Sequence, residues 1–385
     1  MYYFDEITDR RNTSSLKWDV GKDELPMWVA DMDFKTAPCV IEAIKKRTEN
    51  GVFGYSVVPR EWNEAVAGWW ERRHGYRPDE NSIIFSTGVI PTISSAVRKL
   101  TTPNENVLIQ TPVYNIFFNS IINNGCRPLE NRLIYENGEY RIDFEDLEKK
   151  LSDPQTTLMI LCNPHNPIGK IWDSETLSKI GNLCKKYHVT VISDEIHCDL
   201  TDPGKSYVPF ASVSDVCREI SITCVAPTKA FNIAGLQTSA VIVPDENLRH
   251  KVNRAINTDE VAEPNAFAID AAIAAFNKGE EWLDELRIYI YDNKCYVRKF
   301  IEENIPEIHV TDSEATYLMW MDVSGLCDTG DFHVRLRKAT GLYVSGGKQY
   351  GGESDNFIRI NVACPMETVR EGMKRLYEGV KMLRE

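Results

Sequence analysis

Residues 222–243 read ITCVAPTKAFNIAGLQTSAVIV and place one lysine, Lys229, between two apolar runs. The first run, ITCV (222–225), is rich in β-branched residues and predicts a buried strand, and SAVIV (239–243) predicts a second one. Burial disfavours the charged form of an amine. A lysine at the end of a buried strand therefore calls for an explanation from the rest of the chain.

Apolar runs alternate with helical patterns through the middle of the sequence. Short, wholly apolar strands separated by helices are typical of a mostly parallel sheet that helices cover on both faces. We therefore predict a doubly wound α/β domain over residues 46–280. The strand-like runs are SIIFST (82–87), NVLIQTP (106–112), TTLMILCNP (156–164), VTVISDE (189–195), ISITCVAP (220–227) and SAVIVP (239–244).

The pattern changes after residue 280. A long charged helical stretch begins at EEW (280–282), and apolar strands TYLMWMDVS (316–324) and FIRINVACP (357–365) follow before a closing helix at 366–383. Helices with an antiparallel set of strands predict a smaller α+β domain over 281–385. The first 45 residues lack strand–helix alternation, and we expect them to join the small domain.

Composition narrows the class of protein. Hydrophobic residues make up 43% of the 385 residues, which is enough to build a sizeable core. The net charge of −13 argues against a nucleic-acid-binding surface or an anionic membrane face. No apolar run has the length of a signal peptide core or a membrane span. We expect a cytoplasmic protein that acts on a small molecule, without nucleic-acid or membrane partners.

Ten cysteines are scattered along the chain, with no C-x-x-C pair and no His/Cys cluster at zinc spacing. We therefore expect reduced thiols and no metal site. Cys162, Cys198 and Cys224 lie near predicted strand ends, but the sequence shows no partner that would make any of them a nucleophile.

Polar groups close several of the predicted strands. Taken singly, each could be a turn, loop punctuation, a helix cap or a solvent-reaching lysine. Ligands of open parallel sheets, however, bind beyond the carboxyl ends of the strands, so these groups are expected to meet. The groups are Gly88 after SIIFST, Asn166 in CNPHNP, Asp194 and His197 in SDEIH, and Lys229 after ITCVAP.

These groups suit one kind of ligand. A helix that opens after a glycine offers free N–H groups to a phosphate. A buried carboxylate can hold a proton on a pyridine nitrogen, and an asparagine can donate to a phenolate oxygen. A desolvated lysine can form a Schiff base with an aldehyde. Together they predict a site for pyridoxal 5′-phosphate.

Seven motifs run in order from residue 25 to residue 365, and through them the chain resembles the fold-type I aminotransferase superfamily of class I and II. Within that superfamily it is most similar to the C–S lyase branch, which includes cystathionine β-lyases and cystalysin. The motifs are LPMWVADMDF (25–34), FGYS (53–56), TPVYNIFF (111–118), CNPHNPIGK (162–170), SDEIHCDL (193–200), APTKAFNIAGLQTS (226–239) and FIRINVACP (357–365).

The resemblance implies roles around the cofactor ring. Lys229 would be the Schiff-base lysine and the acid/base at the substrate Cα. Asp194 would pair with the pyridine nitrogen and Asn166 with the phenolate oxygen. His197 takes the place near that oxygen where many aminotransferases have a tyrosine, and Tyr114 would stack on the ring.

The resemblance also implies how the phosphate is held. The N–H groups of Gly88, Val89 and Ile90 would bind it, together with Thr228. Tyr55 would reach the phosphate of the neighbouring subunit and would contribute to catalysis there. This arrangement implies a homodimer with shared active sites.

For the amino-acid substrate, the resemblance assigns the α-carboxylate to Arg359, whose fork-shaped donor group suits bidentate binding, with Asn166 and Ala30 beside it. Apolar and aromatic residues could line the side-chain pocket or simply pack in the core, where residues of these kinds are common. They are Trp18, Met27, Trp28 and Tyr317.

Two departures from the family pattern concern the phosphate. Val89 and Ile90 stand where relatives often carry a small residue and a hydroxyl. Gln237 stands where many aminotransferases have a phosphate-binding arginine. The missing arginine fits the lyase branch better than the transaminases.

The resemblance implies α,β-elimination from cystathionine, cysteine or a related S-substituted cysteine, with pyruvate, ammonia and a thiol as products. An aminotransferase remains open, because both reactions share the cofactor motifs. A regulatory partner-binding protein with secondary lyase activity is a further alternative, for which the sequence singles out no surface.

Overall fold

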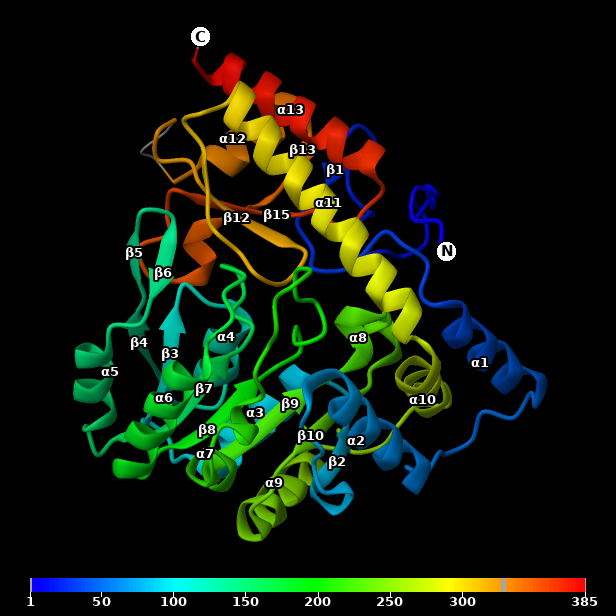
Figure 1. Cartoon of the computed structure of the whole chain (residues 1–385), viewed down its shortest axis with the longest axis vertical. Coiled ribbons are helices and arrows are strands. Elements are labelled where there is room, and N and C mark those ends of the chain that lie inside the picture. The colour runs from blue at the N-terminus through cyan, green and yellow to red at the C-terminus, as the bar shows by residue number, and fades with distance from the viewer. Residues whose placement is uncertain (1, 327–329, 385) are drawn as a thin grey trace.

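A sheet of seven strands forms the larger lobe of the computed structural model, which describes residues 2–326 and 330–384 (Figure 1). In spatial order the strands are β2 (Ile83–Ser86), β10 (Ser239–Ile242), β9 (Ser221–Val225), β8 (Thr190–Asp194), β7 (Thr156–Cys162), β3 (Asn106–Thr111) and β4 (Arg127–Arg132). All but β10 run in the same direction. The carboxyl ends of those strands therefore meet at one edge of the sheet.

Side chains of the central strands alternate between two apolar clusters. On β3, Val107 and Ile109 join one cluster and Leu108 the other; on β7, Ile160 and Met159 divide in the same way. Because both faces are buried, these strands are apolar throughout. The first cluster includes side chains of α3 (Val89–Leu100), α4 (Ile116–Ile122) and α9 (Glu246–Thr258), and the second those of α5 (Phe144–Leu151), α6 (Ser174–Lys186) and α7 (Asp215–Ile220).

The six predicted strands of this lobe are confirmed, and their ends lie within two residues of the predicted ones. Strand β4 was not predicted, because its sequence RPLENR is mostly polar. It lies at the edge of the sheet and pairs only with β3, so its polar side chains can reach solvent. Strand β10 is antiparallel because only α8 (Pro227–Ala230) and a single 3-10 turn separate it from β9, without a long crossover helix.

The smaller lobe holds a four-stranded antiparallel sheet; the sequence predicts the antiparallel arrangement and two of the four strands. In spatial order its strands are β11 (His309–Val310), β12 (Leu318–Asp322), β15 (Phe357–Asn361) and β14 (Ser345–Gly346). Its helices are α11 (Glu280–Asn304), α12 (Phe332–Thr340) and α13 (Met366–Arg384). Figure 1 shows α11 and α13 side by side over this sheet. A separate hairpin joins β5 (Ile134–Glu136) to β6 (Glu139–Arg141).

The N-terminal segment contacts both lobes. Strand β1 (Leu25–Pro26) pairs with β13 (Leu342–Tyr343), and Met27 lies in the apolar cluster of the smaller lobe. Phe34 instead lies in a cluster with α2 (Arg60–His74) and α10 (Ala268–Lys278). Helix α1 (Pro38–Glu49) packs on α10, so the predicted boundary at residue 45 falls inside a helix. The division into domains stays a prediction.

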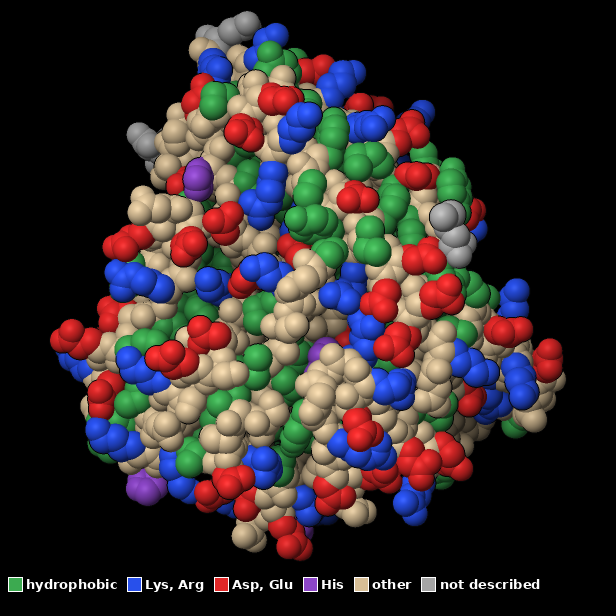
Figure 2. All heavy atoms as spheres, viewed as in Figure 1, with side chains coloured by type: hydrophobic (Ala, Val, Ile, Leu, Met, Phe, Trp, Pro, Cys, Tyr) green, Lys and Arg blue, Asp and Glu red, His purple; other side chains and the backbone are tan. Residues whose placement is uncertain are grey.

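Charged side chains of both signs are interspersed over the face shown in Figure 2. In the described part of the chain, every helix is too short or too polar to cross a bilayer.

Helix α11 spans the two lobes. Its first half, with Leu283 and Leu286, packs in the cluster of the larger lobe, and its second half, with Val297 and Ile301, packs in that of the smaller lobe. Between these halves the ammonium of Lys294 is buried against Asp202, with Nζ at 2.6 and 2.7 Å from the two carboxylate oxygens. Burial lowers the pKa of Lys294, and the Asp202 carboxylate opposes that shift.

We predict that Lys294→Met lowers the free energy of unfolding by about 3–5 kcal/mol, because it leaves the Asp202 carboxylate buried without its cation. Lys299→Met is the matched control on the same helix, since Lys299 is 74% exposed and its ion pair with Glu303 spans 3.9 Å. The control should cost less than about 1 kcal/mol. Urea unfolding of both variants measures the difference, and equal losses would contradict the prediction.

Candidate active site

The carboxyl edge of the main sheet carries the polar groups that the sequence places at strand ends. Asp194 is the last residue of β8, and Gly88 lies two residues after β2. Asn166 and Lys229 each lie four residues beyond their strands, β7 and β9. Arg359 reaches the same place from β15 of the other sheet, where it bonds to Asn166. The site therefore lies where the two lobes meet.

The amine of Lys229 is partly buried and donates to the backbone carbonyl of Ala30 at 2.5 Å. Burial and then the positive charge of Arg359 lower its pKa to about 8, whereas Asp31 and Asp194 oppose the shift. Near neutral pH a useful fraction of the amine is uncharged. An uncharged amine is the form that attacks a carbonyl carbon and accepts a proton.

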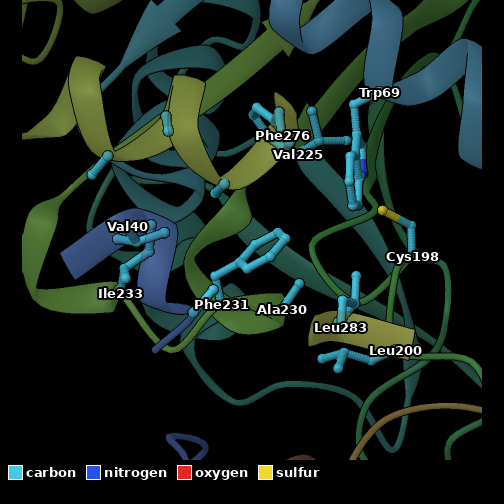
Figure 3. Close-up of a cluster of buried hydrophobic side chains, with 14 of the residues drawn as sticks. Val40, Trp69, Cys198, Leu200, Val225, Ala230, Phe231, Ile233, Phe276 and Leu283 are labelled. Atoms are coloured by element: carbon cyan, nitrogen blue, oxygen red, sulfur yellow. The ribbon is translucent and has the colours of Figure 1, made fainter. Parts of the chain in front are cut away.

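Apolar packing fixes the turn that carries Lys229. Ala230, Phe231 and Ile233 point into a buried cluster with residues from four other helices (Figure 3). Those neighbours include Val40, Trp69, Phe276 and Leu283. With three of the next four residues anchored, the lysine side chain extends from a rigid turn toward the carbonyl of Ala30.

Asp194 is 4% exposed, and its Oδ1 accepts the N–H of Ile196 at 3.1 Å. Burial raises its pKa to about 7, against the opposing effects of that hydrogen bond and of the Lys229 charge. The neighbouring Glu195 is also fully buried, and burial raises its pKa to about 8. Its carboxyl group, however, takes bonds from Ser193, Tyr207 and the N–H of Phe210. Of Asp194 and Glu195, Asp194 is therefore the acid whose carboxyl group can bind a ligand.

His197 is buried, and its pKa falls to about 3 because of burial first and then the charges of Lys229 and Arg359. It is neutral at physiological pH. Its Nδ1 has no hydrogen-bond partner among the described residues. Tyr114, just beyond β3, lies close enough to Arg359 and Asp194 for their charges to act on its pKa, which burial raises.

The guanidinium of Arg359 is held on three sides. Nη1 donates to Asn166 Oδ1 at 3.1 Å, and Nη2 donates to the carbonyl of Trp28 at 3.0 Å. The guanidinium carbon lies 5.1 Å from the centre of the Tyr350 ring. Nε is buried and has no partner in the described part of the chain. The group is thus fixed in place and keeps donor capacity for a carboxylate.

The N-terminus of α3 supplies the predicted phosphate donors. The helix begins at Val89 after Gly88, has no side-chain cap, and is regular from its first turn, with Thr92 N–H bonded to the Gly88 carbonyl. The first N–H groups of a helix have no partner within it, so those of Val89 and Ile90 can bind an anion. A β-carbon on Gly88 would lie 3.1 Å from Pro91 Cδ, so a side chain there would crowd this turn.

Other predicted residues lie elsewhere or remain open. Thr228 is buried beside Lys229, and Gln237 is exposed with a left-handed φ of 51°. Tyr55 is fully exposed in a segment without helix or strand, so this chain does not bring it to its own site. Met27 is core, as its cluster shows, and Trp18 donates to Asp33.

Two functional neighbours were missed at the level of sequence. Asn361, two residues after Arg359, donates to the carbonyls of Val29 and Asp31, both at 2.6 Å. Asn232, three residues after Lys229, donates to the carbonyls of Met32 and Phe34. The hydrogen-bond partners of Asn361 and Asn232 are backbone atoms, which the sequence does not distinguish. The one signal for these two residues was that they lie close in sequence to Arg359 and Lys229.

The residues fit pyridoxal phosphate. The raised pKa of Asp194 marks a buried carboxylate that would gain from a cationic ring nitrogen. Unpartnered nitrogens of His197 and Arg359 border the same space, and the α3 N-terminus suits a phosphate. Lys229, Asp194, Asn166, His197 and Tyr114 would hold the ring.

A second group of polar side chains has a structural explanation. His74, Cys198 and Asp199 offer atoms within 4.8 Å of one another, the spacing that a metal ion would need. The Asp199 carboxylate already accepts Trp69 Nε1 at 3.0 and 3.1 Å and contacts His74 Nε2 at 3.0 Å. Burial and the carboxylates of Asp199 and Glu195 hold the Cys198 pKa well above its ordinary value. These contacts tie α2 to the loop after β8.

Burial also raises the pKa values of Cys162 and Cys224, which keeps both thiols protonated. Cys327 lies outside the described residues.

Comparison with known proteins gives consistent results. Residues 23–376 match the family model described as aminotransferase class I and II. Cystathionine beta-lyase PatB of Bacillus subtilis is 44% identical over 97% of this chain and 98% of its own length. Cystalysin from Treponema denticola, whose structure contains pyridoxal 5′-phosphate, superposes with a TM-score of 0.96 at 33% identity, over all of both chains. A pyridoxal-phosphate-bound protein of Clostridium difficile 630, described as a candidate aminotransferase, gives 0.96 at 39% identity, over 99% of this chain and 100% of that one.

The raised pKa of Asp194 predicts a pH-dependent stability in the cofactor-free protein. Because the folded value of about 7 exceeds the ordinary 3.8, folding favours the protonated acid, and this contribution is lost as pH rises through 7. Between pH 5 and 8 the wild type should lose about 2–3 kcal/mol more than Asp194→Asn, which cannot titrate. Urea unfolding at both pH values measures this. Parallel pH dependences of the two proteins would refute the prediction.

Proposed function

The chain belongs to the aminotransferase class I and II family, and from this premise we propose that it is a pyridoxal-phosphate-dependent C–S β-lyase. Its substrates are cystathionine, cysteine or related S-substituted cysteines, and its products are pyruvate, ammonia and a thiol. The observation that carries the proposal is the amine of Lys229, which is bonded to the Ala30 carbonyl, has a pKa of about 8 and lies within reach of the Arg359 charge. The 44% identity to a cystathionine β-lyase favours the lyase reaction.

Binding of the amino acid follows from Arg359. Its guanidinium is fixed by Asn166 and the Trp28 carbonyl and would take the α-carboxylate, which sets the Cα next to Lys229. Neutral His197 beside Arg359 and Lys229 adds no positive charge to a site that already holds two cations.

Bound pyridoxal phosphate supplies an electron sink that stabilises negative charge at the substrate Cα. Asp194 would hold the proton on the ring nitrogen, and Asn166 with His197 would face the phenolate oxygen. Lys229 takes the proton from Cα at its Nζ. The same Nζ can then give a proton to the sulfur as the Cβ–S bond breaks, which is general acid catalysis by the group that acted as base.

The partner in this site is a second copy of the chain. Exposed apolar side chains gather in one segment without helix or strand, and such groupings are typical of interfaces. They are Val52, Phe53, Tyr55 and Val57. Tyr55 projects fully from this segment and would reach the phosphate of the neighbouring subunit. The protein would act in the cytoplasm, where its nine described free cysteines would stay reduced.

Aminotransferase activity is the second candidate, and the 39% identity to the Clostridium difficile protein favours it. Both reactions use Lys229, Asp194 and Arg359 in the same way up to removal of the Cα proton. They differ in where the reaction goes next: transamination would need the proton delivered to the aldehyde-derived carbon of the cofactor, whereas elimination expels a group from the substrate Cβ.

A substrate panel tests the function. We expect the purified holoenzyme to release pyruvate and a thiol from cystathionine and from cysteine conjugates without added keto acid. Lys229→Ala should lower this rate by at least about 10³-fold and abolish the cofactor mass retained after borohydride reduction. Turnover that requires a keto acid, with no pyruvate from any conjugate, would replace the lyase by an aminotransferase.

Subunit mixing tests the shared site. Lys229→Ala and Tyr55→Ala should each be nearly inactive alone. When they are co-expressed, a heterodimer has one site with both defects and one with neither, so random pairing should restore about a quarter of wild-type activity. Activity no greater than the sum of the two single variants would show that Tyr55 does not act across the interface.

A further inference from the structure

Residues 27–34, the strap, run between the two lobes, and side chains from both sheets hold their backbone carbonyls. Arg359 and Asn361 of β15 bind the carbonyls of Trp28, Val29 and Asp31. Asn232, just after Lys229, binds the carbonyls of Met32 and Phe34. The strap is thus fixed on each side of Ala30.

The Ala30 carbonyl is the one in the strap that accepts from the catalytic lysine. It takes Lys229 Nζ at 2.5 Å and the hydroxyl of Tyr317 at 3.0 Å. The two donors therefore lie no more than about 5.5 Å apart, the sum of the two distances. A carbonyl oxygen has two lone pairs, and here each has one donor.

Tyr317 is held firmly in place. It lies just before β12, is fully buried, and its own carbonyl accepts the N–H of Val362 at 2.9 Å. Its ring contacts that of His197 edge-on, with centres 6.3 Å apart. Ala30 is its hydroxyl's one hydrogen-bond acceptor among the described residues. A tyrosine confined in this way has a defined hydroxyl position.

We propose that Tyr317 is a positioning residue for Lys229, whose hydroxyl keeps the Ala30 carbonyl bonded when the lysine amine leaves it. The inference rests on the proposed function, in which Nζ must move from Ala30 to cofactor and substrate. Without the hydroxyl, departure of the amine would leave the partly buried Ala30 carbonyl without a hydrogen-bond donor, which is unfavourable. Two donors on one oxygen also weaken each other, so the hydroxyl loosens the hold on the ammonium.

The other groups that face the amine are unchanged when only this hydroxyl is removed. Arg359 from β15 disfavours the ammonium, while Asp31 from the strap and Asp194 from β8 favour it. His197 is neutral beside them. Removing the Tyr317 hydroxyl adds no charge to this set, so a change in the protonation of Lys229 would report on the shared carbonyl alone.

The test is Tyr317→Phe, which retains the ring beside His197, with Tyr140→Phe as the matched control. Tyr140 is also buried, and its hydroxyl accepts Trp320 Nε1 at 3.0 Å, without contact to Ala30. Circular dichroism checks that both variants fold. The first readout is the rate at which the cofactor-free chain takes up pyridoxal phosphate at different pH values, followed by protein mass after borohydride reduction.

We expect the acid limb of this uptake to move to higher pH by about half a unit in Tyr317→Phe and to stay in place in Tyr140→Phe. In the holoenzyme, kcat should fall about ten-fold with KM changed less than about two-fold, because Arg359 is untouched. An unshifted acid limb, an equal shift in the control, or a raised KM at constant kcat would overturn the proposal. Uptake needs no substrate, so this result is independent of whether the substrate panel yields pyruvate.

Discussion

The site depends on the amine of Lys229, which must be uncharged in a fraction of the molecules near neutral pH. Lys229 is placed at the end of a buried strand, where desolvation and the charge of Arg359 lower its pKa to about 8. A more exposed lysine would stay protonated near neutral pH, and one without an acceptor would bury an unsatisfied donor. The Ala30 carbonyl meets the second requirement without adding a charge that would undo the first.

That acceptor comes from far away in the sequence and requires both lobes. The carbonyl lies 199 residues from Lys229, and the strap that carries it is fixed by Asn361 and Arg359 from the smaller sheet. The apolar cluster under Ala230 and Phe231 fixes the lysine from the other side. The distance of 2.5 Å between amine and carbonyl is therefore set by the docking of two sheets, with α11 packed into the core of each.

The sequence predicts those strands and site residues that act through the chemistry of their side chains. Apolar runs predicted six strands of the main sheet. The rule that ligands bind beyond strand ends predicted that Asp194, Asn166 and Lys229 lie close together. The resemblance names Ala30 only beside the substrate carboxylate. The role of its carbonyl as the acceptor of Lys229 was not predicted, because a backbone carbonyl looks the same in every residue. Asn232 was missed for the same reason, since it donates to backbone carbonyls, and Tyr317 was named only as a pocket or core residue, without its bond to Ala30. The polar edge strand β4 lacks the apolar pattern on which strand prediction relies.

The charges around Lys229 favour a neutral side chain at position 197. Lys229 and Arg359 already place two cations at the site, with Asp194 and Asp31 as nearby acids. A third cation at position 197 would raise the cost of protonating Lys229, and burial keeps His197 neutral. Gln237 is exposed and uncharged, and the dipole and free N–H groups at the N-terminus of α3 can bind an anion.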